Sequence, residues 1–127
     1  MDLWYQAAKE LEARNEGFVL ATVVRAVAPT SAKPGDKAVV TEDGVVQGWI
    51  GGSCAEPTVK KEAKLALADG ACRVVQITPD PVTSAREGLV VVPMTCYSGG
   101  ELEIYLEPHP AKAELLVFGN SPVAQAL

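Results

Sequence analysis

The sequence contains no block of basic residues and no long apolar run. Its 11 Lys and Arg residues are spread along the chain among 16 Asp and Glu residues, so the net charge is −5. Nucleic-acid binding is disfavoured because neutralising many phosphates requires clustered Lys and Arg. No apolar run approaches the roughly 18 residues that a bilayer span requires, and residues 1–17 are charged, unlike a signal peptide. We therefore expect a cytoplasmic protein that binds neither nucleic acid nor membrane.

Ligands for a zinc ion and partners for a disulfide framework are also scarce. The three cysteines, Cys54, Cys72 and Cys96, are unequally spaced and form no CxxC pair. His109 is the single histidine. It lies between two prolines in what we interpret as a linker, where it acts as a spacer. We expect reduced thiols.

The remaining pattern is that of one globular domain. The 127 residues are close to the size of a single domain, and 48% of them are hydrophobic. Apolar residues at helical spacing predict an N-terminal helix that ends at Gly17. Residues Phe18–Val27 are apolar at nearly every position, which predicts a central strand covered on both faces. Residues Glu101–Glu107 alternate, which predicts a half-exposed strand with Leu102, Ile104 and Leu106 on its buried face.

Shorter elements complete an α+β fold with a mixed sheet and two main helices. A second helix ends at Gly70, and two starts compete: a cap at Ser53, or a start about three residues later with Pro57 at the first helical position. The Asp43-Gly44 pair predicts a hairpin turn. Short strands are predicted at residues 37–41, 45–50, 72–78 and 88–93.

The turn Ile50–Glu56 is the first candidate site. Gly51 and Gly52 permit positive φ and bring backbone N–H groups close to a bound anion, and the following helix start adds partial positive charge. Cys54 lies at or just before this helix start, where a thiol has a lowered pKa and is more nucleophilic. An inert buried cysteine in a tight connection remains the alternative.

Two further loops contain polar residues of interest. Cys96 lies beside Thr95 in a glycine-ended loop that precedes a strand. Cys72 instead opens an apolar strand and is predicted to be buried. The loop of residues 28–37 offers Lys33 to a phosphate, although solvated lysines are the commoner case.

The last residues resemble the start of a dinucleotide-binding unit without completing it. An apolar run, Leu115–Phe118, precedes Gly119, but Ser121 stands where a second glycine is needed, and the chain ends at Leu127 before any acidic ribose ligand. We expect no independent dinucleotide binding. The apolar run is predicted to attach to the domain as an extra strand and to favour self-association as a dimer.

Three segments together resemble one family. GWIGGSCAE, TCYSGGELEIYLEP and LLVFGNSPVAQAL occur in this order in the XdhC/CoxI family of accessory proteins for molybdenum hydroxylases, such as xanthine and carbon monoxide dehydrogenases. A PTSAKPG loop is similar to the family's proline-and-glycine bend. The resemblance implies an XdhC/CoxI-like N-terminal domain at residues 1–110. Residues 111–127 would form a linker and the opening strand of an incomplete Rossmann-type domain.

The resemblance also implies a function. Family members bind the molybdenum cofactor, as molybdopterin or its dinucleotide form, during sulfuration by a cysteine desulfurase and deliver it to the apo-hydroxylase. The family's cysteine positions match Cys54 and Cys96, which could bind molybdenum. We expect a chaperone that carries no catalytic residues and works as a homodimer. The cofactor-binding residues are then expected to be Lys33, Gly51, Gly52, Ser53, Cys54, Glu56, Thr95 and Cys96.

Two other classes of function remain open. In a sulfurtransferase or redox protein, Cys54 would be the nucleophile and Cys96 would resolve the intermediate. In a plain assembly module, the exposed alternating strand would serve oligomer contacts.

Overall fold

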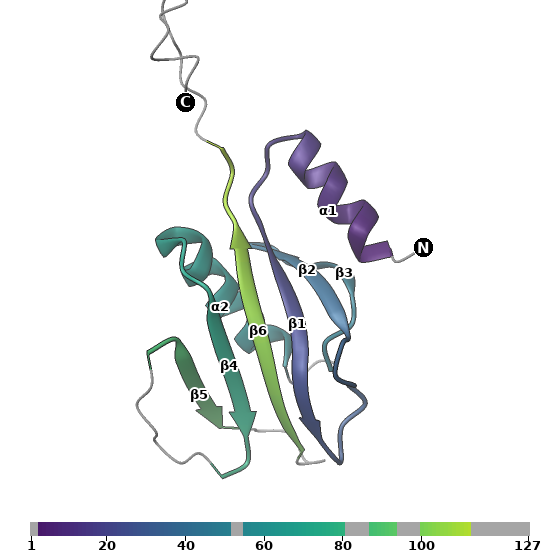
Figure 1. Cartoon of the computed structure of the whole chain (residues 1–127), viewed down its shortest axis with the longest axis vertical. Helices are drawn as coiled ribbons and strands as arrows, with labels where there is room; N and C mark the ends of the chain where they lie inside the picture. The colour runs from purple at the N-terminus through teal and green to yellow at the C-terminus, as the bar shows by residue number, and fades with distance from the viewer. Residues whose placement is uncertain (1–2, 52–54, 81–86, 94–99, 113–127) are drawn as a thin grey trace, which may run out of the picture.

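The computed structural model describes residues 3–51, 55–80, 87–93 and 100–112, apart from the side chains of residues 45 and 46. One sheet with strand order β3-β2-β1-β6-β4-β5 forms the centre (Figure 1). Every neighbouring pair is antiparallel except β4 and β5, which are parallel. The predicted α+β fold with a mixed sheet is therefore confirmed. The elements are α1 (Leu3–Ala13), β1 (Phe18–Val27), β2 (Lys37–Thr41), β3 (Gly44–Gly48), α2 (Glu56–Asp69), β4 (Arg73–Thr78), β5 (Leu89–Pro93) and β6 (Glu101–His109).

The main core lies between the sheet and α2. The three apolar side chains of β6 predicted to be buried, Leu102, Ile104 and Leu106, are at most 1% exposed, which confirms the alternation. They pack with apolar residues of β1, β2, β4 and α2. Burial of each such side chain contributes about 1.5–3 kcal/mol before entropy is subtracted.

The N-terminal helix, α1, packs on the other face of the sheet but covers only part of it. Its buried Leu11 packs with Phe18 and Val39. Beyond this contact the same face of β1 is open, and Val24 is 50% exposed. The prediction that β1 is covered on both faces is therefore correct only for its first half, because α1 lies over the start of the strand.

Helix α2 begins according to the later of the two predicted starts. Its N-cap is Ala55, whose side chain makes no cap hydrogen bond, and Pro57 lies in the first turn. The start capped by Ser53 is therefore wrong. At the other end Gly70 adopts the left-handed conformation, with φ of 72°, and its N–H donates to the carbonyl of Ala66, as expected of a helix-ending glycine.

His109 is the last residue of β6, which corrects its interpretation as a linker residue. Its ring stacks on Phe18 with centroids 4.8 Å apart, and its Nε2 lies 2.7 Å from Glu107 Oε1. The preceding Pro108 is tolerated in the strand because this end of β6 pairs with β1 alone, while β4 pairs only with residues 102–106. The missing N–H therefore leaves no bond of the sheet unmade.

Cys72 is exposed, so its predicted burial is wrong. The strand begins one residue later, at Arg73, whose side chain is directed to the α2 side. Cys72 instead forms a side-chain hydrogen bond with Tyr105 on the open face of the sheet.

The predicted strand Leu115–Phe118 lies outside the described residues. Within the described part of the chain, no helix is long and apolar enough to cross a membrane.

Candidate functional site

The loop that follows β1 and the described end of the Cys96 loop, Gly100, meet at one end of the sheet. β1 ends and β6 begins there, and Val27 pairs with Glu101 across the two strands (Figure 1, lower end). Gly100, the residue before β6, is buried against the loop that follows β1. A Cβ built on Gly100 would overlap the carbonyl oxygen of Pro29 and lie 2.9 Å from its carbonyl carbon. We call residues 28–36 the Pro29 loop.

The third loop, the turn Ile50–Glu56, reaches the same place. A Cβ built on Gly51 would lie 3.4 Å from Ala32 Cβ, in the Pro29 loop, and 2.9 Å from Leu102 Cδ1. Ile50 and Ala55, which flank the centre of the turn, are each 1% exposed. The described ends of both cysteine-containing loops therefore lie against the Pro29 loop.

Gly51 is required here for packing and for its backbone conformation. Its φ is +114°, a region that side chains rarely adopt. The direction in which a side chain would project is occupied by Leu102 and Ala32. Gly51 therefore allows its backbone to pack closely against the core residues Leu102 and Ala32.

The Pro29 loop is held firmly by hydrogen bonds. The Gly35 N–H donates to the Val23 carbonyl at 2.7 Å, and the Val23 N–H donates to the Asp36 carbonyl at 2.8 Å. Asp36 Oδ2 also accepts a hydrogen bond from the N–H of Lys33 at 2.8 Å. These bonds fix the loop to β1 and leave the side chain of Lys33 exposed.

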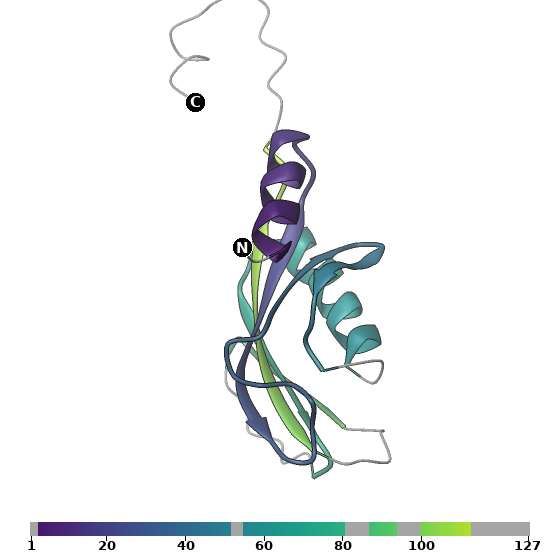
Figure 2. The same cartoon turned by 90° about the vertical axis from the view of Figure 1, so that its right-hand side faces the viewer.

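Three of the predicted cofactor-binding residues lie within the described part of the chain. Gly51 contacts the Pro29 loop, Lys33 belongs to that loop, and Glu56 is exposed in the first turn of α2. Figure 2 shows that α2 starts at its lower end, the end nearer the Pro29 loop. The other predicted residues, Gly52, Ser53, Cys54, Thr95 and Cys96, lie outside the described residues.

Sequence reasoning missed the neighbours that hold these loops. In the sequence the loop of residues 28–37 draws attention only through Lys33, whereas the contacts of Pro29 with Gly100 and of Ala32 with Gly51 join residues far apart in the chain. A usable signal was the glycine directly before β6. A glycine at the start of a regular strand often marks a close backbone approach.

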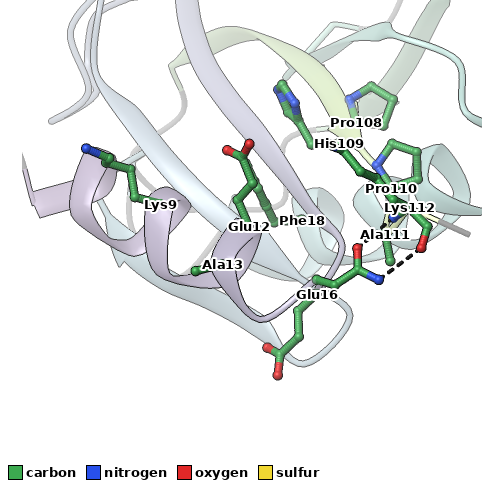
Figure 3. Close-up of a pocket in the computed structure, with 11 residues that line it drawn as sticks. Lys9, Glu12, Ala13, Glu16, Phe18, Pro108, His109, Pro110, Ala111 and Lys112 are labelled. Atoms are coloured by element: carbon green, nitrogen blue, oxygen red, sulfur yellow. Dashed lines mark hydrogen bonds between the residues drawn. The ribbon is translucent and has the colours of Figure 1, made fainter. Parts of the chain in front are cut away.

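A separate cavity of about 610 Å³ lies at the opposite end of the sheet (Figure 3). It is bounded by the second half of α1, by Phe18 and by the chain leaving β6, residues 108–112. Side chains of both charge signs line it, including Lys9 and Glu12. The cavity therefore has no single charge that would select a ligand.

Tyr105 and Asp69, whose pKa values are shifted, lie away from the Pro29 loop. The hydrogen bond with the Cys72 side chain raises the pKa of Tyr105. The backbone N–H of Ala71 and then the guanidinium of Arg73 lower the pKa of Asp69. Arg73 also lies 3.6 Å from the buried Glu62, which joins α2 to β4. These groups join α2 to β4 and lie outside the candidate site.

Comparison with known proteins gives the chain a family. The model of the XdhC and CoxI family matches residues 11–78, more than half of the chain and including the Pro29 loop and the turn Ile50–Glu56. No similar protein was found among the curated proteins. The chain resembles a crystal structure described as a xanthine dehydrogenase from Bacillus halodurans, with a TM-score of 0.58 and 22% identity. This similarity covers 81% of the present chain and 29% of the other, so the chain spans less than a third of that protein, and the likeness shows the fold. From the family match, the chain belongs to the XdhC and CoxI family.

Proposed function

We propose that this chain acts in the maturation of molybdenum hydroxylases by holding the molybdenum cofactor before its insertion into the apo-enzyme. Family membership supports the general role. The observation that carries the specific proposal is the contact of Gly51 and Gly100 with one loop, since these glycines border the two loops that contain Cys54 and Cys96. The cofactor is cargo, received and released without turnover.

Chain connectivity supports joint action of the two cysteines. Cys54 is one peptide bond from the buried Ala55, and Cys96 is four residues from the buried Gly100. Four residues span at most about 14 Å. Both thiols can therefore reach one bound molecule beside the Pro29 loop.

The residue chemistry fits the parts of the cofactor. Thiolates of Cys54 and Cys96 are soft ligands suited to molybdenum or to sulfur. The exposed Lys33 and the first N–H groups of α2, which the Ala55 side chain leaves uncapped, can receive the phosphate. Glu56 is repelled by a phosphate and is better placed to accept hydrogen bonds from the amino and amide groups of the pterin.

The remaining proposed contacts are Gly52, Ser53 and Thr95, whose N–H and hydroxyl groups can donate to oxygens of the cofactor. The proposed partners are the apo-hydroxylase that receives the cofactor, a cysteine desulfurase that supplies sulfur, and a second copy of the chain. Residues 111–127 are proposed to form a linker and the opening strand of an incomplete Rossmann-type domain.

The test is calorimetric titration of the chain with molybdopterin cofactor under anaerobic conditions. We expect Cys54→Ser and Cys96→Ser each to weaken binding by about tenfold or more, equivalent to about 1.4 kcal/mol. Cys72→Ser is the matched control, because this thiol is exposed and bonded to Tyr105 away from the Pro29 loop. Equal weakening by all three variants, or wild-type binding by Cys54→Ser, would contradict the proposal.

The sulfurtransferase alternative gives a different result. In that case incubation with a cysteine desulfurase and cysteine leaves a persulfide on Cys54, and the chain passes the sulfur to an acceptor over repeated cycles. Mass spectrometry of the trapped persulfide, together with a count of sulfur transferred per chain, separates this activity from cofactor holding.

A further inference from the structure

We propose that the side of the sheet opposite α2 is an interface at which two copies of this chain pack face to face about a two-fold axis. We call this surface, from Thr22 to Val27 on β1 and across the neighbouring strands, the open face. In Figure 2, α2 lies on one side of the sheet, whereas α1 lies only at its upper end. The inference rests on the second copy named in the proposed function and adds the surface that this copy binds.

The register of the strands places two rows of side chains on the open face. Residues directly opposite one another in neighbouring strands project to the same side of a sheet. The first row consists of Lys37, Thr22, Tyr105, Val74 and Leu89, from β2 to β5. The second row consists of Arg25, Glu103, Gln76 and Val91, from β1 to β5. The row between them, Val23, Ile104 and Val75, is 0% exposed in the core on the α2 side.

Apolar side chains of the open face remain exposed beyond the reach of α1. Val24 is 50% exposed and Val27 is 39% exposed. Val24 is the extra residue of a bulge, since the register with β6 shifts between Val23 and Arg25. Exposed apolar surface that is combined with an arginine and a tyrosine is typical of protein interfaces.

The charges of the open face are divided by the line between β1 and β6. The cations Arg25 and Lys37 belong to β1 and β2, whereas the carboxylates Glu101 and Glu103 belong to β6. Within one chain the Arg25 guanidinium lies 3.2 Å from Glu101 and 3.3 Å from Glu103, yet half of its side chain is exposed. Because the strand order is β3-β2-β1-β6-β4-β5, the line between β1 and β6 is also the middle of the sheet.

A two-fold axis along this line makes the open face complementary to itself. Rotation about the axis lays β1 over β6 of the second copy, β2 over its β4 and β3 over its β5. Arg25 and Glu103 are register partners, so Arg25 of each copy then faces Glu103 of the other. A two-fold interface requires such self-complementarity. The division of charge therefore favours a second copy over a partner whose surface has one sign of charge.

The open face is large enough for a weak specific dimer. Six strands spaced about 4.8 Å apart, over about six residues each, give a surface of about 29 by 20 Å. Two copies would cover on the order of 1,100 Å² in total, a size typical of weak and reversible complexes. We therefore expect association that depends on protein concentration.

The experiment is sedimentation velocity of the full chain from about 10 to 500 µM, where a weak dimer dissociates on dilution. A reducing agent prevents disulfides between Cys72 thiols. We expect the mass to rise from 13.3 kDa toward twice this value. Val24→Asp should weaken association by at least about tenfold, because it places a charge in the apolar part of the interface. Leu65→Asp is the matched control, since Leu65 is 46% exposed on α2 and lies outside the open face.

Charge reversal distinguishes contacts between copies from contacts within one chain. Arg25→Glu and Glu103→Arg each create like charges across the two-fold axis, so each variant alone should associate at least about tenfold more weakly. An equimolar mixture of the two variants restores opposite charges between copies, while the like charges within each chain remain. We therefore expect the mixture to form a heterodimer about as strongly as the parent dimer. A role confined to one chain predicts no recovery on mixing.

Circular dichroism confirms that each variant is folded, and Val24→Asp serves alone if the charge variants do not fold. A wild-type mass of 13.3 kDa at the highest concentration would overturn the inference and leave the open face to the apo-hydroxylase. Association unchanged by Val24→Asp, or a mixture that stays monomeric, would also overturn it. Cofactor titration of Val24→Asp separates the two proposals: a dimeric wild type that binds no cofactor overturns only the proposed function.

Discussion

The side-chain amide of Asn15 holds the backbone of Lys112 by two hydrogen bonds. Its Nδ2 donates to the Lys112 carbonyl at 2.9 Å, and its Oδ1 accepts from the Lys112 N–H at 2.8 Å. Asn15 itself has a φ of 55°, the left-handed conformation that Asn adopts more readily than most residues. The turn after α1 thus fixes the path by which the chain leaves β6.

Replacing Asn15 by Gly should separate the two roles of this residue. Gly keeps the positive φ but removes both hydrogen bonds, so we expect a loss of about 1–2 kcal/mol in the free energy of unfolding. Urea denaturation measures this change. The control is Lys112→Ala, which retains the backbone groups that Asn15 binds and should change stability by less than about 0.5 kcal/mol. Equal stability of Asn15→Gly and the wild type would contradict a stabilising role for the two bonds.

Asp69 should contribute to the acid sensitivity of the fold. The N–H of Ala71 and the Arg73 guanidinium lower its pKa from the ordinary 3.8, so the folded state binds the proton less tightly than the unfolded state. The contribution is therefore present above about pH 4 and is lost as the pH falls through the lower folded value. Asp69→Asn should remove this part of the pH dependence. Urea unfolding of both proteins between pH 2 and about 7 would refute the assignment if their curves stayed parallel.

Tyr105 should show the opposite pH dependence. The Cys72 side chain raises its pKa above 10.0, so this tyrosine favours the folded state below its unfolded pKa, and the contribution disappears as the pH rises through the folded value. Removing the partner with Cys72→Ala should bring the Tyr105 titration back toward 10.0. Ultraviolet absorbance during an alkaline titration measures tyrosine ionisation. The part of the absorbance change that is missing in Tyr105→Phe belongs to Tyr105. An unchanged titration in Cys72→Ala would rule out the hydrogen bond as the cause.

The stack of Phe18 and His109 should stabilise the end of β6. Rings 4.8 Å apart and inclined by 14° form an offset or parallel contact, and such pairs contribute about 0.5–1.5 kcal/mol beyond their buried area. We expect His109→Ala to destabilise the fold by about 1 kcal/mol in urea denaturation. His109→Phe keeps a planar ring and should restore most of the loss. Equal losses in the two variants would show that the ring contact contributes nothing.

Local patterns predicted those features that depend on neighbours in the chain. The alternation of Leu102, Ile104 and Leu106 and the helix end at Gly70 are of this kind, because period and conformational freedom are visible in a few residues. The exposure of Val24 depends instead on how far α1 extends over the face of β1. The exposure of Cys72 depends on β4 beginning at Arg73, one residue later than predicted.

The candidate site also has features that the sequence predicts and features that it does not. Its cysteine loops were recognisable from glycines beside thiols and from the family resemblance. Their common support was not, because Pro29 and Gly100 are separated by most of the domain and meet only after β1 and β6 have paired. The burial of Glu62 in α2 was equally hidden, since it depends on Arg73 arriving from the next strand.

The central position of β6 has a consequence for the order in which the fold can be completed. Among the strands that the structure describes β6 comes latest in the chain, yet it lies between β1 and β4, which are not neighbours in the sheet. Without residues 101–109 the remaining strands divide into β3-β2-β1 and β4-β5, and the inner edges of β1 and β4 have no partner strand. Such edges bind other strands readily. Pairing of β6 with both β1 and β4 is thus what joins the two groups of strands into one sheet.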